Sequence, residues 1–370
     1  MGYRVDPLPA LSAAPTARLA GAPLHAAAPD LVEALAARRA RSEDARVGPG
    51  ELRAAEVGPG GRVALRFPGS GGPRPVAPSL LEDVRRFVGL SRSDFVHERH
   101  ESPATLARRI DEALEERGER GLFVRLVEGR IRAILPPDYR PLDHLEAATA
   151  FRDECAALRA VGVDVRLETA DLDEGGDLFL AAAAPSLAAE VGAGDWLYAG
   201  IVLANSECGA APLEVRPRIY RVVCANGAVA QEAEAEGFEV PKVATPGQPT
   251  ATPFRARLAR AFERGLRPER VEREAALGRA ARGALLASPF EHLQHLVARG
   301  LLAEGERDAA RLLFDEGRDA SLYGLANAVT AAAHGRRRGS ELRRALALER
   351  LGAEIVRGDH GPPVGAPVFA

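Results

Sequence analysis

Two long β-prone runs near the middle of the chain constrain its fold more than any other feature. They are WLYAGIVLAN (196–205) and LEVRPRIYRVVCAN (213–226), and both are rich in the branched and aromatic residues that favour strands. A short segment with turn-forming residues separates them, as in a hairpin. Together with the runs VDVRLE (163–168) and DLFLAAA (177–183), they predict a mainly antiparallel sheet. The run LFVRLVEGRIRAIL (122–135) predicts a hairpin around Glu128–Gly129, and DLVEALAARRARSE (30–43) predicts a short helix.

Helical patterns flank these runs. Apolar residues recur at helical spacing over 79–88, 102–118 and 143–158. A Ser79/Glu82 capping box is expected to start the first of these helices, and Asp143 to cap the third. Beyond residue 254 the chain is helical almost throughout. Strands followed by helices predict an α+β fold, in which a mainly antiparallel sheet with flanking helices is followed by an all-helical C-terminal region.

Composition divides the chain into five segments. We expect a low-complexity, Ala/Pro-rich arm that is poorly ordered or loosely docked, an α+β core domain, a Pro/Thr linker, a helical region and a flexible tail. These segments cover residues 1–45, 46–239, 240–253, 254–357 and 358–370, in that order.

The charge and hydropathy of the chain exclude several classes of protein. The 370 residues carry a formal net charge of −3, so the whole chain has no electrostatic attraction to nucleic acid or to a membrane. No apolar run is long enough to span a bilayer, and the N-terminus has no apolar stretch of the signal-peptide type. Three cysteines form neither a disulfide framework nor a Cys-x-x-Cys pair. We therefore expect a cytoplasmic protein with no membrane partner.

The cysteines and histidines predict no catalytic or metal site. Cys155 lies on an apolar helical stripe, which indicates a core residue. Cys208 and Cys224 stand at opposite ends of a predicted strand ~36 Å long, too far apart for a disulfide or a shared metal. The histidines have no metal-ligand spacing, and the sequence has no phosphate-binding loop or nucleophile elbow. We expect no cofactor and no metal.

One face of the second long run could contact nucleic acid. Alternation places Arg216, Arg218 and Tyr220 on the same face, where arginines could contact phosphates and the tyrosine could stack on a base. The alternative is a solvated outer face of an antiparallel sheet, with Pro217 marking an edge or a bulge.

A second basic feature lies near the C-terminus. The segment HGRRRGSELRR (334–344) carries Arg336, Arg337, Arg338, Arg343 and Arg344. Residues 251–350 hold nineteen arginines against thirteen acidic residues, so this region is locally basic. Phosphate contact by the helical region and a solvated helix surface both explain this excess.

Three motifs together resemble a known family of phage- and plasmid-like proteins, the domain of unknown function 932. The motifs are RAILPPDYRPLDH (132–144), GIVLANSECG…RIYRVVCANG (200–227) and YGLANAVTAAAH…LERLGAEIV (323–356). The matching positions are Tyr139, Arg140, Asp143, Asn205, Ser206, Glu207, Gly209, Arg221, Cys224, Asn226, Gly227, Asn327 and Thr330.

The resemblance implies an origin in a mobile element and no established activity. Asn226–Gly227 suits a tight hairpin turn and Asn205–Ser206 a second turn, and Arg221 could clamp Glu207 or Asp143 across the sheet.

Three functions remain open from the sequence. The first is a non-catalytic protein that binds single- or double-stranded nucleic acid in mobile-element replication or recombination, as a monomer or a homo-oligomer. The second is a structural or protein-interaction component. The third is an enzyme built around Asn205, Glu207 and Cys224.

Overall fold

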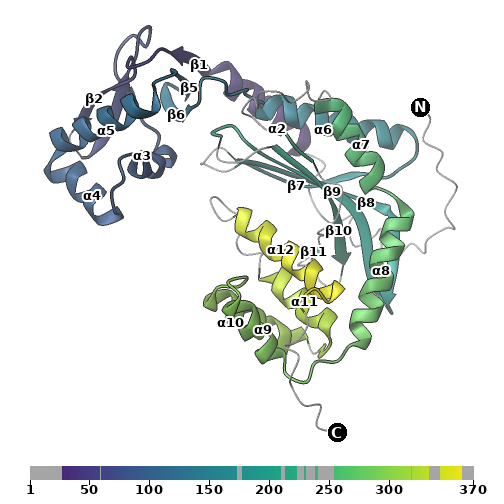
Figure 1. Ribbon diagram of the computed structural model, residues 1–370. Helices are drawn as coiled ribbons and strands as arrows, with labels where there is room; N and C mark the ends of the chain where they lie inside the picture. The colour runs from purple at the N-terminus through teal and green to yellow at the C-terminus, as the bar shows by residue number, and fades with distance from the viewer. Residues whose placement is uncertain are drawn as a thin grey trace.

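The computed structural model of the chain shows an α+β architecture, which confirms the predicted fold class (Figure 1). It describes residues 27–58, 60–172, 177–209, 213–222, 229–230, 238–240, 254–317, 319–332 and 342–360.

Two small antiparallel sheets and three helices form an N-terminal unit. One sheet has the order β1-β5-β6 and the other the order β2-β3-β4. Their strands are β1 (Ser42–Val47), β5 (Leu122–Val127), β6 (Arg130–Leu135), β2 (Arg53–Gly58), β3 (Arg62–Arg66) and β4 (Arg74–Pro75). A 3-10 turn, η1 (Pro78–Leu80), leads into α3 (Leu81–Phe87), which is followed by α4 (Arg92–Glu101) and α5 (Pro103–Arg117). The predicted hairpin at 122–135 is present, with positive φ at both Glu128 and Gly129 as its two-residue turn requires.

Two local predictions for this unit need correction. Ser79 forms no capping box, because the residues around it make the 3-10 turn and Glu82 instead pairs with Arg85. The arm is also docked from residue 27 onward, and the helix predicted within it is present. Helix α2 (Ala27–Ala40) packs against helix α6 (His144–Ala160) and strand β7 (Arg166–Leu172) of the central sheet region, and β1 pairs with β5 over six residues. The residues before 27 lie outside the described part of the chain.

A twisted antiparallel sheet forms the centre of the molecule. Its order is β11-β10-β9-β8-β7, and β12 also pairs with β10. The strands are β7 (Arg166–Leu172), β8 (Asp177–Gly192), β9 (Asp195–Ser206), β10 (Leu213–Val222), β11 (Val229–Ala230) and β12 (Phe238–Val240). Pro217 in β10 falls between the residues that pair with β12 and those that pair with β11, so its missing N–H interrupts neither ladder.

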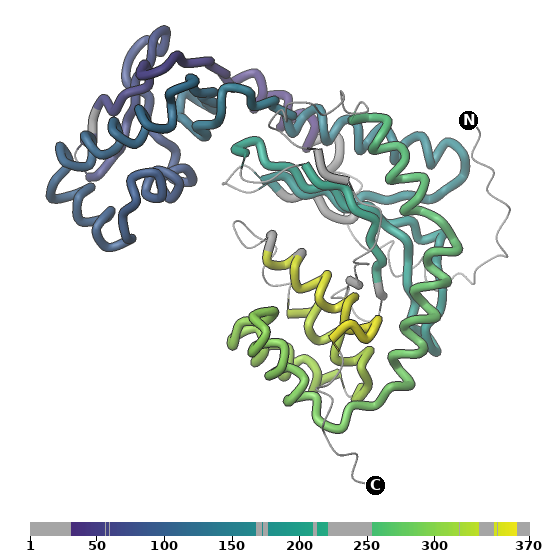
Figure 2. Tube along the Cα trace, in the orientation of Figure 1, coloured from purple at the N-terminus to yellow at the C-terminus, as the bar shows by residue number. Residues whose placement is uncertain are grey.

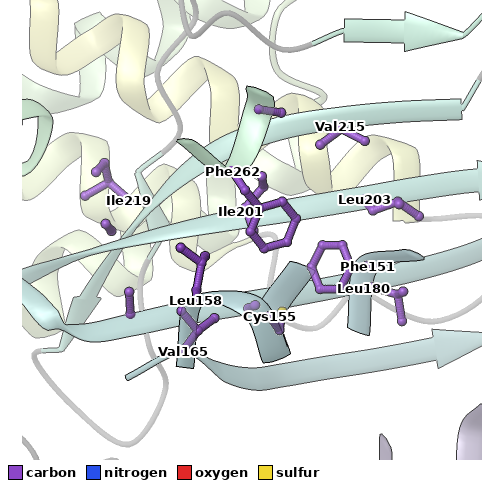
Figure 3. Packing of buried hydrophobic residues seen from close by; sticks show 14 of the residues in the cluster. Phe151, Cys155, Leu158, Val165, Leu180, Ile201, Leu203, Val215, Ile219 and Phe262 are labelled. Carbon is purple, nitrogen blue, oxygen red and sulfur yellow. The ribbon is translucent and has the colours of Figure 1, made fainter. Parts of the chain in front are cut away.

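Three helices cover one face of this sheet, here called the outer face. They are α6 (His144–Ala160), α7 (Phe254–Gly265) and α8 (Pro268–Gly283). Alternate residues of β8, β9 and β10, among them Leu180, Ile201 and Val215, point into this core (Figure 3). Phe151 of α6 meets Phe262 of α7 edge to face, with ring centroids 5.1 Å apart. The largest hydrophobic cluster of the described residues lies here.

The opposite face of the sheet, here called the inner face, looks onto a C-terminal bundle (Figures 1 and 2). The bundle consists of α9 (Pro289–Ala298), α10 (Glu304–Gly317), α11 (Leu322–Ala331) and α12 (Leu342–Arg357). It has its own hydrophobic core, separate from that of the outer face. On the inner face of the sheet itself the buried apolar cluster is small: Phe179, Ala181 and Val202. No helix in the described residues is long and apolar enough to cross a bilayer.

Cys155 faces the outer core, as its apolar stripe predicts. Its side chain is buried beside Phe151, and burial raises the pKa of the thiol to about 12. We expect Cys155 to react with iodoacetamide at pH 8 at least ~100-fold more slowly in the native protein than in urea, because the thiolate is the nucleophile. Mass spectrometry of timed samples measures this rate for each cysteine. Comparable labelling rates of Cys155 in the native protein and in urea would show that its thiol is not buried.

Candidate functional site

The first two resembling motifs meet at the N-terminus of α6. Asp143 occupies the N-cap position of this helix, but its side chain makes no capping hydrogen bond. Its carboxylate instead binds the Arg125 guanidinium at 2.8 Å and that of Arg39 at 2.7 Å. Arg125 is 1% exposed and also donates two hydrogen bonds to Asp44, of 2.8 and 2.9 Å. One buried arginine therefore bridges two carboxylates, from β1 and from the start of α6.

Glu207 supplies the cap that Asp143 does not. Its Oε1 accepts a hydrogen bond of 2.7 Å from the backbone N–H of His144, the first residue of α6. The second carboxylate oxygen lies 3.8 Å from the His144 ring. A carboxylate at this position also interacts favourably with the helix dipole. Glu207, which directly follows β9, thus joins this strand to the start of α6, although His144 is 63 positions earlier in the sequence. This contact between β9 and α6 is here called the α6 junction.

Asn205 strengthens the same junction. Its side-chain amide donates to the Leu142 carbonyl at 3.0 Å and lies 2.9 Å from Nδ1 of His144. Asn205 therefore joins the end of β9 both to the backbone that precedes α6 and to the ring of its first residue. Asn205 and Ser206 are the last residues of β9 and do not form the predicted turn. The turn follows them and ends at Gly209, whose φ of +72° favours glycine.

The two remaining residues of the first motif, Tyr139 and Arg140, differ in how far they are buried. Tyr139 is buried and packs on Phe123, with ring centroids 5.5 Å apart. Burial raises the pKa of its phenol well above the ordinary value, so it stays neutral. Arg140, in contrast, is exposed.

These contacts describe a structural clamp between the N-terminal unit and the central sheet. Two of the motifs contribute to it, but the predicted role of Arg221 is wrong. Arg221 pairs with Leu197, whereas Asn205 pairs with Leu178 near the other end of β9. Eight residues of strand separate these positions by ~26 Å, beyond the reach of an arginine side chain. The cations of the clamp are Arg125 and Arg39, which bind Asp143, and Arg38, which lies 4.0 Å from Glu207. Cys224, Asn226 and Gly227 lie outside the described residues.

The third motif brings two helices of the bundle into close contact. Thr330 of α11 is buried and donates a hydrogen bond of 2.9 Å to the Asn327 carbonyl. A Cβ on Gly352 of α12 would lie only 2.2 Å from the Thr330 methyl group. The glycine therefore allows α12 to cross closely over α11.

The inner face of the sheet carries the predicted arginine and tyrosine side chains. Leu213, Val215 and Ile219 belong to the outer core, so Arg218 and Tyr220 point the other way. On β9, Gly200 stands opposite Arg218 and Tyr198 stands opposite Tyr220. A Cβ on Gly200 would lie 2.1 Å from the Tyr220 ring, so only glycine lets this ring lie flat against β9.

Arg218 is the central side chain of this face. It is 0% exposed, and its Nη2 donates a hydrogen bond of 2.6 Å to Oε1 of Glu349 on α12. Its guanidinium carbon lies 4.9 Å from the ring centre of Tyr220 and 5.8 Å from that of Phe179. Its other two nitrogens, Nε and Nη1, have no hydrogen-bond partner among the described residues. Buried guanidinium donors are rarely left without acceptors, because their desolvation is costly.

The other predicted arginines have different surroundings. Arg216 forms an ion pair with Glu214, which lies 3.8 Å from Arg350 of α12. Arg344 binds Glu306 of α10, and this ion pair joins two helices of the bundle. Arg336, Arg337, Arg338 and the side chain of Arg343 lie outside the part of the chain that the structure describes. In that part, no cluster of three or more His, Cys, Asp or Glu residues could hold a metal ion.

Sequence reasoning missed the partner of Arg218. Glu349 is 1% exposed and lies on the buried stripe of α12, between Leu348 and Gly352. A charged residue on an otherwise apolar helical stripe is a signal that could have identified it, since buried carboxylates are nearly always paired. Arg125 could be found in the same way, because it interrupts the apolar run of β5.

Comparisons with known proteins identify a family but no function. No curated protein and no solved structure matches this chain. The family model described as "Domain of unknown function (DUF932)" matches residues 136–351, which include the α6 junction, the central sheet and nearly all of the bundle. Because this match covers more than half of the 370 residues, the chain belongs to the DUF932 family.

Proposed function

We propose that this protein binds nucleic acid through the inner face of its central sheet, without catalysing a reaction on it. The observation that carries the proposal is the state of Arg218. Its guanidinium lies near two aromatic rings and has two N–H-bearing nitrogens without an acceptor among the described residues. A planar guanidinium fork matches the oxygens of a phosphate group, and arginine is the preferred residue for such contacts.

The surroundings of Arg218 favour a single strand over a duplex. Tyr220 places an aromatic ring beside Gly200 of β9, and stacking of bases on such rings is tolerant of sequence. The paired strands β9 and β10 offer a continuous surface along which a backbone could run. The resemblance to phage- and plasmid-like proteins suggests a role in the replication or recombination of a mobile element.

The α6 junction does not support the enzymatic alternative. Glu207 accepts a hydrogen bond from the helix backbone, and Asp143 binds two arginines. These carboxylates have partners that explain them structurally. The junction therefore acts as a scaffold that positions the sheet.

Fluorescence anisotropy with the full chain tests the proposed function. The probe is a labelled 30-nucleotide single strand, compared with the matched duplex, over a series of salt concentrations. We expect binding that weakens as salt rises, with a slope of about −0.7 per phosphate contact for the single strand. Arg218→Gln should weaken binding by roughly tenfold or more and reduce the magnitude of the slope, because a charged hydrogen bond contributes about 1.5–3 kcal/mol.

The matched control is Arg92→Gln. Arg92 is an exposed arginine of the N-terminal unit, with a side chain that is 85% exposed. This variant should bind within about twofold of the wild type, since it removes the same charge far from the inner face. Far-UV circular dichroism checks that both variants fold. An absence of binding at low salt, or equal affinities for the two variants, would refute the proposal.

A further inference from the structure

We infer that α12 is an intramolecular competitor of nucleic acid, with the Glu349 carboxylate bound where a phosphate group would bind. The inference rests on the proposed function and adds a regulation of the same site. In the structure Arg218 and Tyr220 face the C-terminal bundle, so a strand can reach Arg218 only when α12 moves away.

The chemistry of the contact supports competition. A carboxylate oxygen on an arginine N–H is the same type of charge-assisted hydrogen bond as a phosphate oxygen on that N–H. Glu349 uses one of the three guanidinium nitrogens, and the two others have no acceptor among the described residues. A phosphate group can accept from two of these nitrogens at once. A phosphate group would therefore satisfy a donor that Glu349 leaves without an acceptor, and this extra hydrogen bond favours displacement of the competitor.

The packing of the bundle allows it to move as a unit. Its core, which includes Leu293, Leu325 and Leu348, is a cluster distinct from the core of the outer face, and Leu322 and Val356 pack against both clusters. Between the bundle and the inner face, the described contacts include two ion pairs, Arg218–Glu349 and Arg350–Glu214. Ion pairs of this kind are typical of the more polar interfaces between domains that move relative to one another.

One end of the bundle is anchored to α8. The backbone N–H groups of Leu286 and Leu322 donate to the carbonyls of Ala320 and Ala284, at 3.0 and 2.8 Å. Tyr323 of α11 also belongs to the core of the outer face. Opening is therefore expected to be a rotation about this α8–α11 contact, in which α11 and α12 stay together and α12 leaves the sheet.

Glu349→Gln tests the inference, because glutamine keeps the shape and removes the charge. We expect this variant to bind the labelled 30-nucleotide strand roughly tenfold more tightly than the wild type. Backbone amides of residues 342–357 should also exchange hydrogen faster, as measured by mass spectrometry. The matched control is Glu354→Gln on the same helix, where the glutamate pairs with His360 and not with the sheet. It should change neither quantity.

The outcomes separate this inference from the proposed function. If the wild type binds and Glu349→Gln binds no more tightly, with unchanged exchange in α12, the competitor is refuted and the proposed function stands. If neither protein binds nucleic acid, the proposed function fails, and the exchange rates alone decide whether Glu349 holds the bundle closed. Where Glu349→Gln does not fold, Glu349→Asp keeps the charge but shortens its reach, and an intermediate gain in affinity is expected.

Discussion

Replacing Arg125 by methionine is expected to lower the free energy of unfolding by about 3 kcal/mol, because it leaves two carboxylates beside a buried apolar side chain. Arg125 is almost fully buried and binds both Asp44 and Asp143. Asp143 keeps Arg39 as a partner, and both carboxylates are about one-fifth exposed, so the loss should lie at the lower end of the range for broken buried pairs. Urea unfolding followed by circular dichroism measures the difference.

Arg140→Met is the matched control for this prediction. Arg140 is exposed and lies in the same motif as Asp143, so its replacement should change the unfolding free energy by less than about 0.5 kcal/mol. Adding Asp44→Asn to Arg125→Met should recover part of the loss, since the double variant no longer leaves that charge without a guanidinium. Equal stabilities of Arg125→Met and the wild type would show that the clamp has no structural role.

Phe151→Ala is expected to lower the free energy of unfolding by about 4 kcal/mol. The ring is 1% exposed and packs edge to face on Phe262, between α6 and α7 on the outer face (Figure 3). Truncation removes the buried apolar area and the aromatic contact and leaves a cavity that the stiff sheet cannot close. Such a loss is a large share of the stability of a typical domain. Thermal and urea unfolding both measure it.

The neighbouring residue provides the control for this second prediction. Arg152 follows Phe151 on α6 but is exposed and forms an ion pair with the adjacent Asp153. Arg152→Ala should therefore change the stability by less than about 0.5 kcal/mol, since exposed ion pairs contribute little. Similar losses in the two variants would mean that position along α6, and not burial, determines the effect.

Periodicity predicted most of the local structure. The helix at 143–158 and the hairpin at 122–135 are where apolar spacing and turn residues place them. Helix α4 escaped prediction because its sequence, RSDFVHERHE, buries only Phe95 and has no apolar stripe. Helix α2 and strand β1 were assigned to a loosely docked arm, since their stability comes from contacts with α6 and β5 and not from their own composition.

The same reasoning predicted only part of the candidate site. Alternation along β10 correctly places Arg218 and Tyr220 on one face, because side chains of a strand point alternately to its two sides. The sequence could not show what covers that face. The sequence predicted either a solvated surface or a polyanion site. Neither hypothesis includes the carboxylate of Glu349, which lies 131 positions after Arg218 in the sequence.

Residue type and a period of two are enough to predict the antiparallel sheet, its apolar outer face and the arginine and tyrosine side chains of its inner face. Tertiary structure alone decided which charges meet. Arg125 with Asp143, Glu207 with the start of α6 and Arg218 with Glu349 are pairs brought together by the packing of distant elements. Buried charges must find partners wherever the fold provides them, and no local pattern records that choice.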